Sequence, residues 1–437
     1  MIVALKNSYH WLLARISAIF YGFPSRKLIV IGVTGTKGKT TSVELIAALL
    51  RTGGERVAFL SSANMDSGNG VSPRTGNTMP GRFAIARFLR RAVTSGCKYA
   101  VLEVTSQGVL QHRHEWIEFD AAVFTNLHPE HVEAHGSFEA YRAAKVSFFE
   151  YVAGGFANNE SATANQRMAE FGFLRFVDSL FYSIFGHTKK EKKFFINSAS
   201  EHGRYFAEAI GDYKVSWYDR KWLVHDFLKN EIEKISPWLR ADFNLENAAA
   251  AAVVALAYGV SAQQVLVGLS EFSGVAGRLE ILEGTDGKRV VIDAALTPES
   301  LEALYQYLAT HYSLLATSSA KSRLICVFGS AGGGRDTWKR PKLGEIADKY
   351  CAKILLTNDD PYTESQQGIV EEIAAGIKDK SKVEIILDRN RAINRAINRA
   401  NPGDVVAITG MGSQTYQYIG KQKLPWSDRE AVQRSLL

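Results

Sequence analysis

Short apolar runs alternate with longer amphipathic stretches over the first part of the chain. The runs predict strands at 28–33, 57–60, 99–104 and 121–125, and the stretches predict helices near 40–52, 81–95 and 137–150. Strands that alternate with helix-length segments are typical of a parallel sheet with helices on both faces. We therefore predict an α/β fold with a doubly wound parallel sheet here.

The later part of the chain shows the same alternation after a looser stretch. Residues from about 154 to 240 lack a clear period and are predicted to form a variable insertion of unassigned role. An Ala-rich helix at 247–258 follows, and Gly274 and Gly277 then offer a flexible break. Beyond it, apolar runs predict strands at 289–293, 323–328, 353–357, 382–386 and 404–408. This order indicates a Rossmann-like α/β domain without G-x-G-x-x-G after its first strand.

The predicted organisation has three parts: an N-terminal helical extension at 1–27, a central α/β domain at 28–274 and a C-terminal α/β domain at 275–437. In the first part, the segment from Tyr9 to Tyr21 is apolar and aromatic but too short to span a bilayer. It predicts an amphipathic helix packed on the central domain, with a membrane-surface contact as the alternative. No integral membrane segment or signal peptide is expected.

Composition narrows the class of protein. A chain of 437 residues with 46% hydrophobic and 22% charged residues predicts a soluble, globular protein of two or three domains. The net charge of +7 is spread along the chain, which suits anionic ligands and does not argue for nucleic acid. Cys97, Cys326 and Cys351 show no C-x-x-C spacing, so neither a disulfide framework nor a thiolate metal site is expected. A reducing cytoplasm fits best.

The sequence GVTGTKGKT at 32–40 follows the first predicted strand and opens a predicted helix. In a phosphate-binding loop of this kind, amides freed by Gly35 and Gly38 point at the ligand and Lys39 supplies a positive charge. A hydroxyl of Thr40 or Thr41 can then reach Mg²⁺. A nucleoside triphosphate is the predicted ligand, and a Gly-rich turn without ligand is the alternative. The residues predicted to bind it are Gly35, Thr36, Lys37, Gly38, Lys39, Thr40 and Thr41.

Three further residues are candidates for chemistry at this loop. Glu103 ends the third predicted strand, and His131 follows the fourth. Because the carboxyl ends of neighbouring parallel strands meet at one edge of a sheet, both can face the triphosphate. Glu103 suits Mg²⁺, which takes oxygen ligands, whereas His131 is a less usual ligand. Lys145 lies in a predicted helix and is either a solvated lysine or a third partner of the site.

Several motifs taken together resemble the Mur ligases, and they are most similar to the type that adds the third residue to the peptidoglycan stem peptide. In chain order they are GVTGTKGKTT, LEVTSQ, FTNLHPEH, HGSFEAYRAAK, FNLENAAAA, GRLE, TPESL and GGRDTWKRP, and the resemblance covers residues 28–437. It implies a cytoplasmic, ATP-dependent amide ligase that adds an amino acid to a muramoyl-peptide-like acceptor through an acyl phosphate. Such a reaction depends mostly on positioning and charge neutralisation.

The resemblance also implies roles for single residues at the nucleotide. Lys39 would stabilise the transferred phosphoryl group, while Thr40 and Glu103 would hold one Mg²⁺. A second Mg²⁺ would be held by Glu103, His131 and Lys145. Lys145 would be carbamylated, because a carbamate offers oxygens where an ammonium would repel the metal. The other positions that match nucleotide-binding residues are Asn126, Asn247, Arg278, Asp293 and Lys339.

Matching also assigns residues to the two substrates. The positions that would hold the acceptor are Thr78, Thr105, Gln111 and Arg113. The Arg113 guanidinium suits a carboxylate of the acceptor, and a structural salt bridge is the alternative. The positions that would bind the amino acid are Asp359, Asp360, Tyr362, Gly410 and Gln414.

Three motifs depart from the family pattern. The motif D-N-P-R reads DDPY here, so Tyr362 replaces the arginine that would hold the distal carboxylate of diaminopimelate. Diaminopimelate is therefore disfavoured, and lysine or another amine is expected at least equally. The motif G-K-G-H-E reads GMGSQ, so Gln414 replaces a glutamate that would hold the ammonium of the amino acid. The motif D-Y-A-H-T-P has Leu296 in place of its histidine.

These ligases normally begin with a domain that binds the uridine diphosphate (UDP) of the acceptor, and only 27 residues precede the first predicted strand. The sequence therefore predicts either an acceptor without UDP, such as a lipid-linked muropeptide or a folate, or a partner protein that presents the acceptor. A nucleotide-binding subunit without ligase turnover is a third alternative, suggested by Leu296 and Gln414. The oligomeric state is not indicated.

Overall fold

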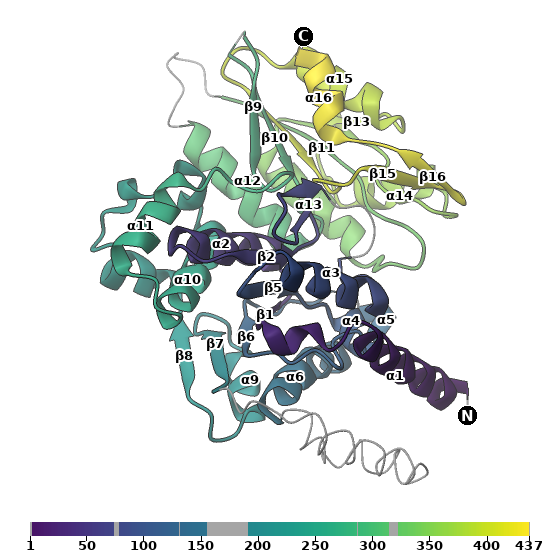
Figure 1. Cartoon of the computed structure of the whole chain (residues 1–437). Helices are drawn as coiled ribbons and strands as arrows, with labels where there is room; N and C mark the ends of the chain where they lie inside the picture. The colour runs from purple at the N-terminus through teal and green to yellow at the C-terminus, as the bar shows by residue number, and fades with distance from the viewer. Residues whose placement is uncertain are drawn as a thin grey trace. The chain divides into compact units, whose positions relative to one another are not determined.

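The computed structural model describes residues 2–73, 78–130, 132–154, 191–285, 287–313 and 322–436. The chain forms two compact units (Figure 1). The first consists of Met1–Leu127, Arg142–Ile235 and Leu245–Glu271, and the second of His128–Tyr141, Ser236–Asn244 and Phe272–Leu437. Each unit is therefore assembled from segments that are separated in the sequence.

The first unit is built on a sheet with the strand order β4-β3-β2-β5-β1-β6-β7-β8. Its strands are β1 (Ile29–Thr34), β2 (Val57–Leu60), β3 (Asn64–Asp66), β4 (Ser72–Pro73), β5 (Tyr99–Glu103), β6 (Ala121–Phe124), β7 (Lys193–Asn197) and β8 (Val215–Tyr218). The central strand β1 pairs in parallel with β5 and β6, whereas β3 and β4 add antiparallel pairings at one edge. The predicted parallel, doubly wound sheet is confirmed.

Strands β7 and β8 come from the stretch that the sequence analysis treated as a variable insertion. Both continue the sheet in parallel, with Phe124 paired to Ile196 and Ile196 paired to Trp217. Residues 155–190 of the same stretch lie outside the described residues. The predicted insertion therefore contributes two strands to the sheet, and its other described elements are short helices.

The helices up to residue 271 follow in chain order. They are α1 (Ile2–Phe20), η1 (Pro24–Lys27), α2 (Lys39–Thr52), α3 (Arg82–Thr94), α4 (Ser106–Leu110), α5 (Val132–His135), α6 (Phe138–Gly154), α9 (Gly203–Ala209), η3 (Trp222–Phe227), η4 (Ile232–Lys234), η5 (Pro237–Arg240), α10 (Asp242–Ala257) and α11 (Ala262–Glu271). In α3 the apolar residues Ile85, Phe88 and Leu89 are buried at helical spacing and Arg87 and Arg90 are exposed. Among the described residues, no helix has both the length and the apolar character needed to cross a membrane.

The second unit contains a sheet with the order β13-β12-β11-β14-β10-β9. Its strands are β9 (Glu280–Glu283), β10 (Arg289–Asp293), β11 (Leu324–Phe328), β12 (Lys353–Leu356), β13 (Val383–Ile385) and β14 (Val405–Thr409), and a separate hairpin pairs β15 (Tyr416–Ile419) with β16 (Gln422–Pro425). The helices are α12 (Pro298–Ser313), α13 (Lys339–Tyr350), α14 (Gln366–Ala375), η6 (Lys380–Lys382), α15 (Arg389–Arg399) and α16 (Asp428–Leu436). Within the six-stranded sheet, every pairing is parallel except that of β9 with β10. The predicted Rossmann-like sheet is therefore confirmed.

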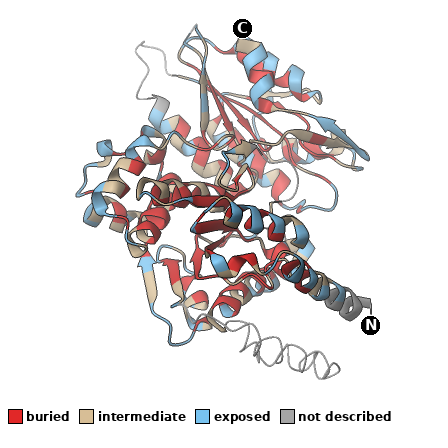
Figure 2. Cartoon of the chain, viewed as in Figure 1, coloured by how far each residue is buried: buried red, intermediate tan, exposed pale blue. Residues whose placement is uncertain are grey.

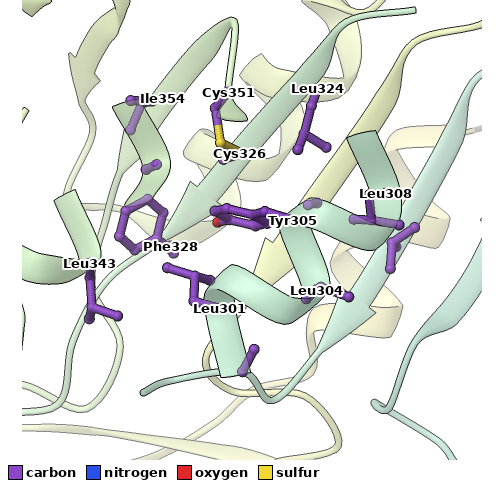
Figure 3. Close-up of a cluster of buried hydrophobic side chains, with 14 of the residues drawn as sticks. Leu301, Leu304, Tyr305, Leu308, Leu324, Cys326, Phe328, Leu343, Cys351 and Ile354 are labelled. Atoms are coloured by element: carbon purple, nitrogen blue, oxygen red, sulfur yellow. A yellow bond between two sulfur atoms is a disulfide. The ribbon is translucent and has the colours of Figure 1, made fainter. Parts of the chain in front are cut away.

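The core of the second unit lies between its sheet and the helices α12 and α13. Side chains of α12 such as Leu301 and Tyr305 pack against Phe328 of β11 and Leu343 of α13 (Figure 3). Every residue of β11 and β14 is buried, as expected for central strands covered on both faces. This core fixes the strand ends on which the candidate site residues of this unit lie.

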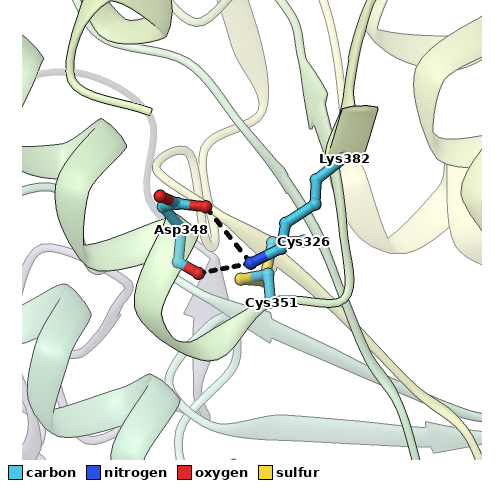
Figure 4. The surroundings of a disulfide bond; sticks show 4 residues. All are labelled: Cys326, Asp348, Cys351 and Lys382. Atoms are coloured by element: carbon cyan, nitrogen blue, oxygen red, sulfur yellow. Dashed lines mark hydrogen bonds and ion pairs between the residues drawn. A yellow bond between two sulfur atoms is a disulfide. The ribbon is translucent and has the colours of Figure 1, made fainter. Parts of the chain in front are cut away.

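Two cysteines are paired, which corrects the expectation from the sequence. Cys326 of β11 and Cys351, which ends α13, form a disulfide with their Cα atoms 6.1 Å apart (Figure 4). Cys351 directly precedes the segment that becomes β12, the parallel neighbour of β11. The separation of 25 residues gave no spacing signal because the pairing of the strands, and not the local sequence, brings the two sulfur atoms together. Cys97 is a free, buried thiol.

Candidate active site

The turn between β1 and α2 requires glycine at two positions. Gly35 has a φ of 146°, and a Cβ there would lie 2.0 Å from Thr125 Oγ1. Gly38 has a φ of 81°, and a Cβ there would lie 2.2 Å from Asn247 Oδ1. Both residues therefore adopt backbone conformations that side chains disfavour, in places without room for a side chain. The resulting turn leads directly into the N-terminus of α2, where backbone N–H groups favour an anion.

Asparagine side chains hold this turn in shape. The Lys37 N–H donates to Asn126 Oδ1 at 2.9 Å, and Asn126 Nδ2 donates to the Lys37 carbonyl at 3.1 Å. Ser42 Oγ of α2 donates to Asn247 Oδ1 at 3.3 Å. Both predicted asparagines thus lie against the phosphate-binding loop, although they are far from it in the sequence.

Glu103 joins the loop to the neighbouring strand. Its Oε2 accepts hydrogen bonds from Thr40 Oγ1 at 3.0 Å and from the Ser62 N–H and Oγ, both at 2.8 Å. Its Oε1 lies 3.9 Å from Lys39 Nζ. Thr40 and Glu103 are each only 4% exposed. The carboxylate is therefore fixed beside the loop lysine and a loop threonine, and the carboxylate and the threonine hydroxyl are hard oxygen donors suited to Mg²⁺.

Lys145 is buried and directed at the loop. Its side chain is 2% exposed, and Nζ donates to the Gly35 carbonyl at 2.7 Å. The helix α6 places it there because Phe148 and Phe149, one turn further on, are fully buried. The solvated lysine considered from the sequence is therefore wrong. His131 lies outside the described residues, so its predicted position is not described.

The residues predicted to bind the acceptor form a connected group. Thr78 Oγ1 lies 3.0 Å from Ser62 Oγ, which itself bonds Glu103. Thr105 Oγ1 caps α4 by accepting from the Gly108 N–H at 3.0 Å. Gln111 Oε1 accepts from Arg113 at 2.6 Å. Thr78 and Glu103 are thus linked through one serine side chain.

Arg113 has a second arginine beside it. Arg113 donates to the Met79 carbonyl and Arg82 donates to the Gln111 carbonyl. The Nε atoms of both arginines are buried without a hydrogen-bond partner. Within the described ranges neither guanidinium forms an ion pair with a carboxylate, so the structural salt bridge considered for Arg113 is not found. Burial lowers the pKa of both groups, and the charge of Arg113 adds to the effect on Arg82.

The remaining nucleotide-binding candidates lie on the second unit. Asp293 ends β10, and its Oδ2 accepts from the Leu279 N–H at 2.6 Å. Arg278 follows Gly277, whose φ is 65°, and Lys339 is buried in the first turn of α13. These residues come from three segments of one unit.

The candidates for amino-acid binding gather in the second unit. A Cβ at Gly410 would lie 2.4 Å from Asp359 Oδ2, and Asp360 Oδ1 accepts from the Tyr418 N–H at 2.7 Å. Burial raises the pKa of Asp359 and raises that of Asp360 to about 6. Tyr362 stacks on Tyr418 with ring centroids 5.0 Å apart.

In the loop that begins at Gly410, after β14, Gln414 Oε1 is buried without a hydrogen-bond partner. The Arg335 guanidinium donates to Tyr362 Oη at 3.4 Å. A positive charge therefore lies beside the tyrosine that replaces the arginine of the family motif.

Sequence reasoning missed Ser62 and Arg82. Ser62 follows β2, the strand beside β5, so the rule that drew attention to Glu103 also applied to it. No comparable signal marked Arg82, which reaches Arg113 through packing of α3. Among the described residues, no three His, Cys, Asp or Glu side chains gather as a metal site.

Comparison with known proteins gives consistent matches. A model of the Mur ligase middle domain matches residues 33–255, and a model described as Mur ligase, glutamate ligase domain matches residues 277–412. A UDP-N-acetylmuramoyl-L-alanyl-D-glutamate--2,6-diaminopimelate ligase of Gloeobacter violaceus is 34% identical over 97% of this chain and 80% of its own length. A ligase of the same name from Coxiella burnetii is 30% identical over 100% of this chain and 84% of its own length.

Solved structures show the same fold. A structure of a UDP-N-acetylmuramoyl-L-alanyl-D-glutamate--2,6-diaminopimelate ligase matches with a TM-score of 0.53 and 25% identity, covering 94% of this chain and 78% of that one. A folylpolyglutamate synthase of Mycobacterium tuberculosis matches with a TM-score of 0.63 and 15% identity, covering 92% of each chain. The second likeness concerns the fold alone.

Proposed function

The chain belongs to the Mur ligase family, and we propose that it is an ATP-dependent, ADP-forming ligase that joins an amino acid to a muramoyl-peptide-like acceptor in peptidoglycan synthesis. The observation that carries this proposal is the cluster of Lys39, Thr40 and Glu103 at the loop between β1 and α2. A loop that only linked a strand to a helix would not need a buried carboxylate fixed beside a lysine and a threonine. We place the reaction in the cytoplasm on the basis of the family alone, because the Cys326–Cys351 disulfide removes the argument from the cysteines.

The proposed reaction has two steps. A carboxylate oxygen of the acceptor attacks the γ-phosphorus of ATP, and the bond to ADP breaks. The amine of the amino acid then attacks the acyl carbon, loses a proton, and displaces phosphate, which keeps the carboxylate oxygen. Both steps need close positioning of reactants and neutralisation of phosphate charge.

The first unit supplies the groups for these needs. The amides of the loop and Lys39 bind and orient the phosphates. Thr40 and Glu103 fit Mg²⁺, which when bound neutralises phosphate charge. Ser62 keeps the Glu103 carboxylate oriented through two hydrogen bonds. We assign Arg278, Asp293 and Lys339 of the second unit to the nucleotide on the basis of the family motifs.

We further propose that Lys145 is carbamylated and, with Glu103 and His131, serves a second Mg²⁺. Its burial supports this role, because a solvated lysine would not lie 2% exposed with Nζ on the Gly35 carbonyl. Carbamylation would replace the positive charge by an oxygen-bearing negative group, which suits a metal beside the loop.

Arg113 and Arg82 are proposed to receive a carboxylate of the acceptor. Two adjacent guanidiniums with unpartnered Nε atoms and no ion pair among the described residues suit an anion, and Glu115 offsets only part of the repulsion that Arg82 receives from Arg113. Thr78 lies on the route from these arginines to Glu103 through Ser62. The acceptor carboxylate that reacts would therefore lie on the Thr78 side of the loop.

We propose that the incoming amino acid binds at the group formed by Asp359, Asp360, Tyr362, Gly410 and Gln414. The two buried carboxyl groups suit an ammonium, and Gly410 allows the backbone to approach Asp359 closely. Tyr362 is a neutral ring stacked on Tyr418, so it offers no fork for a second carboxylate, and the exposed Arg335 guanidinium beside it donates to the Tyr362 hydroxyl. We propose that the amino acid is lysine or another amine without a distal carboxylate, in contrast to the diaminopimelate named for the relatives.

The experiment that tests this function offers the purified chain ATP, Mg²⁺ and a panel of acceptors. UDP-linked and lipid-linked muramoyl dipeptides and a folate are each supplied with lysine, diaminopimelate or an amino-acid mixture, and mass spectrometry identifies products. We expect ADP and a muramoyl tripeptide, with lysine used in preference to diaminopimelate. Folate extension, or ATP binding without any product, would overturn the proposal.

A further inference from the structure

Helix α1 presents its large apolar side chains to solvent. Of its residues from Tyr9 to Phe20, the exposed ones are Tyr9, Leu12, Ile16, Ile19 and Phe20, and Phe20 is 74% exposed. A surface helix normally buries such a stripe and exposes polar residues. Figure 2 shows exposed positions along the outer side of α1 and of α3.

The side of α1 that faces the protein carries Trp11, Arg15, Ser17 and two alanines, and not the large aliphatic residues of the helix. Arg15 is 6% exposed, with its guanidinium carbon 5.7 Å from the ring centroid of Trp11 and 5.4 Å from that of Trp116. Ala14 and Ala18 pack with Trp116, and Ser17 is also buried. The helix is therefore anchored through an arginine and small residues, which leaves the apolar stripe outside as a built feature.

The stripe continues onto α3, on which α1 packs. Phe20 contacts Phe83 of α3 with ring centroids 6.4 Å apart, and Phe83 is 40% exposed. Six of the fourteen large hydrophobic residues that are exposed in the described part of the chain belong to this patch. A patch of this kind marks an interaction surface.

The charged side chains that α1 and α3 themselves carry are of one sign, although Glu115, which follows α4, interacts electrostatically with Arg82 at the start of α3. The exposed residues Arg87, Arg90 and Arg91 follow Phe83 along α3. The sequences of α1 and α3 contain no aspartate or glutamate. An apolar stripe bordered by arginines complements a layer with an apolar interior and an anionic surface. A second copy of the chain would bring the same arginines to the contact, which opposes self-association.

We infer that α1 and the outer face of α3 dock the protein on an anionic phospholipid bilayer, with Leu12, Ile16, Ile19 and Phe20 entering the acyl boundary and the α3 arginines on the headgroups. The interaction is peripheral, since no described helix is able to span a membrane. The inference does not depend on the proposed reaction.

The test measures binding of the full chain to vesicles of phosphatidylcholine with and without phosphatidylglycerol, at low and high salt. We expect binding to the anionic vesicles that weakens with salt. The double substitution Ile16→Glu with Phe20→Glu should lower the partition coefficient by about tenfold or more, because two anchors are replaced by charges. Arg87→Gln with Arg90→Gln should lower it by about tenfold on anionic vesicles only.

The matched control is Trp217→Glu with Leu424→Glu, which removes two exposed apolar residues elsewhere on the chain and should leave binding unchanged. Circular dichroism and nucleotide binding confirm that each variant is folded. The inference is overturned if the native chain ignores anionic vesicles, or if the α1 variant binds as well as the native chain. A dimer that the α1 variant dissociates, without lipid binding, would identify a second copy as the occupant instead.

Discussion

Glu103 is the residue on which the proposed chemistry most depends. One of its carboxylate oxygens accepts three hydrogen bonds from Thr40 and Ser62, and the other faces Lys39. An amide at this position would keep the shape but lose the negative charge. Position and charge at this residue are therefore separable by substitution.

We expect Glu103→Gln to lower kcat/KM for ligation by about 100-fold or more, because a charged group at the phosphates is lost. Nucleotide binding without Mg²⁺ should change little. Glu44→Gln is the control, since Glu44 bonds Ser61 and Asn64 nearby but has no proposed role in catalysis. Steady-state kinetics that leave Glu103→Gln near the native rate would rule out the metal role.

Lys145 provides a second test at the residue scale. We expect Lys145→Ala to reduce ligation by at least about 100-fold while circular dichroism and nucleotide binding show that the fold is kept. The carbamate has its own readout: native protein equilibrated with ¹³C-bicarbonate should show a carbamate carbon resonance that Lys145→Ala lacks. Native activity in the variant, or no difference between the two spectra, would remove the proposed carbamate.

Asp360 gives the second unit a pH-dependent stability. Burial raises its pKa from 3.8 to about 6, with the neighbouring Asp359 adding to the shift. Between these two values the folded state binds a proton that the unfolded state does not, so the native protein loses stability as pH rises through 6. Above that pH the folded state keeps a buried carboxylate at a cost.

We therefore expect Asp360→Asn to melt about 2–6 °C higher than the native protein at pH 8, with the difference shrinking toward pH 4. The amide oxygen can still accept from the Tyr418 N–H. Melting curves across this range, recorded for both proteins, provide the comparison. A difference that does not depend on pH would contradict the raised pKa.

At the scale of elements, a buried ion pair ties strand ends of the second unit together. Arg389 at the start of α15 contacts Asp428 at the start of α16 at 2.7 Å, and both side chains are fully buried. Arg389 also donates to the carbonyls of Asn358, after β12, and Thr409, at the end of β14. The pair thus supports the two loops that carry Asp359 and Gly410.

We expect Asp428→Ala to destabilise this unit by about 3–5 kcal/mol, because an unpaired guanidinium stays buried. Glu430→Gln is the control, because its pair with Arg434 is exposed and 3.8 Å long, and the loss should be below about 1 kcal/mol. Denaturant titration measures both. Similar stability for the two variants would mean that the buried pair does not support the strand ends.

The sequence predicted elements best where the signal was local. The strand at 57–60 matches β2, and the loop at 32–40 was recognisable because its glycines, lysine and threonines are consecutive. Glu103 was predicted because the carboxyl ends of neighbouring parallel strands meet at one edge of a sheet. Ser62 could have been found by the same rule, whereas Arg82 and the burial of Lys145 depend on packing between distant segments, which no local pattern reports.

At the scale of the whole molecule, the order of segments along the chain does not predict which compact unit each segment joins. Residues 128–141 and 236–244 belong to the second unit although the sequence analysis assigned both to the central domain. Strands β7 and β8 extend the first sheet from a stretch without periodicity. The helix α1 was expected from its apolar content. Which of its sides faces the protein could not be predicted, because Arg15 packs on Trp116, which lies far along the chain.

The most direct test of the account follows the oxygen atoms of the whole reaction. The accepted muramoyl dipeptide is prepared with ¹⁸O in its reactive carboxylate and incubated with the protein, ATP, Mg²⁺ and the amino acid. We predict that the released phosphate carries one ¹⁸O, because the carboxylate oxygen attacks the γ-phosphorus and stays bonded to it when phosphate is displaced. Product formation with unlabelled phosphate would contradict the acyl phosphate and, with it, the role assigned to the phosphate-binding loop.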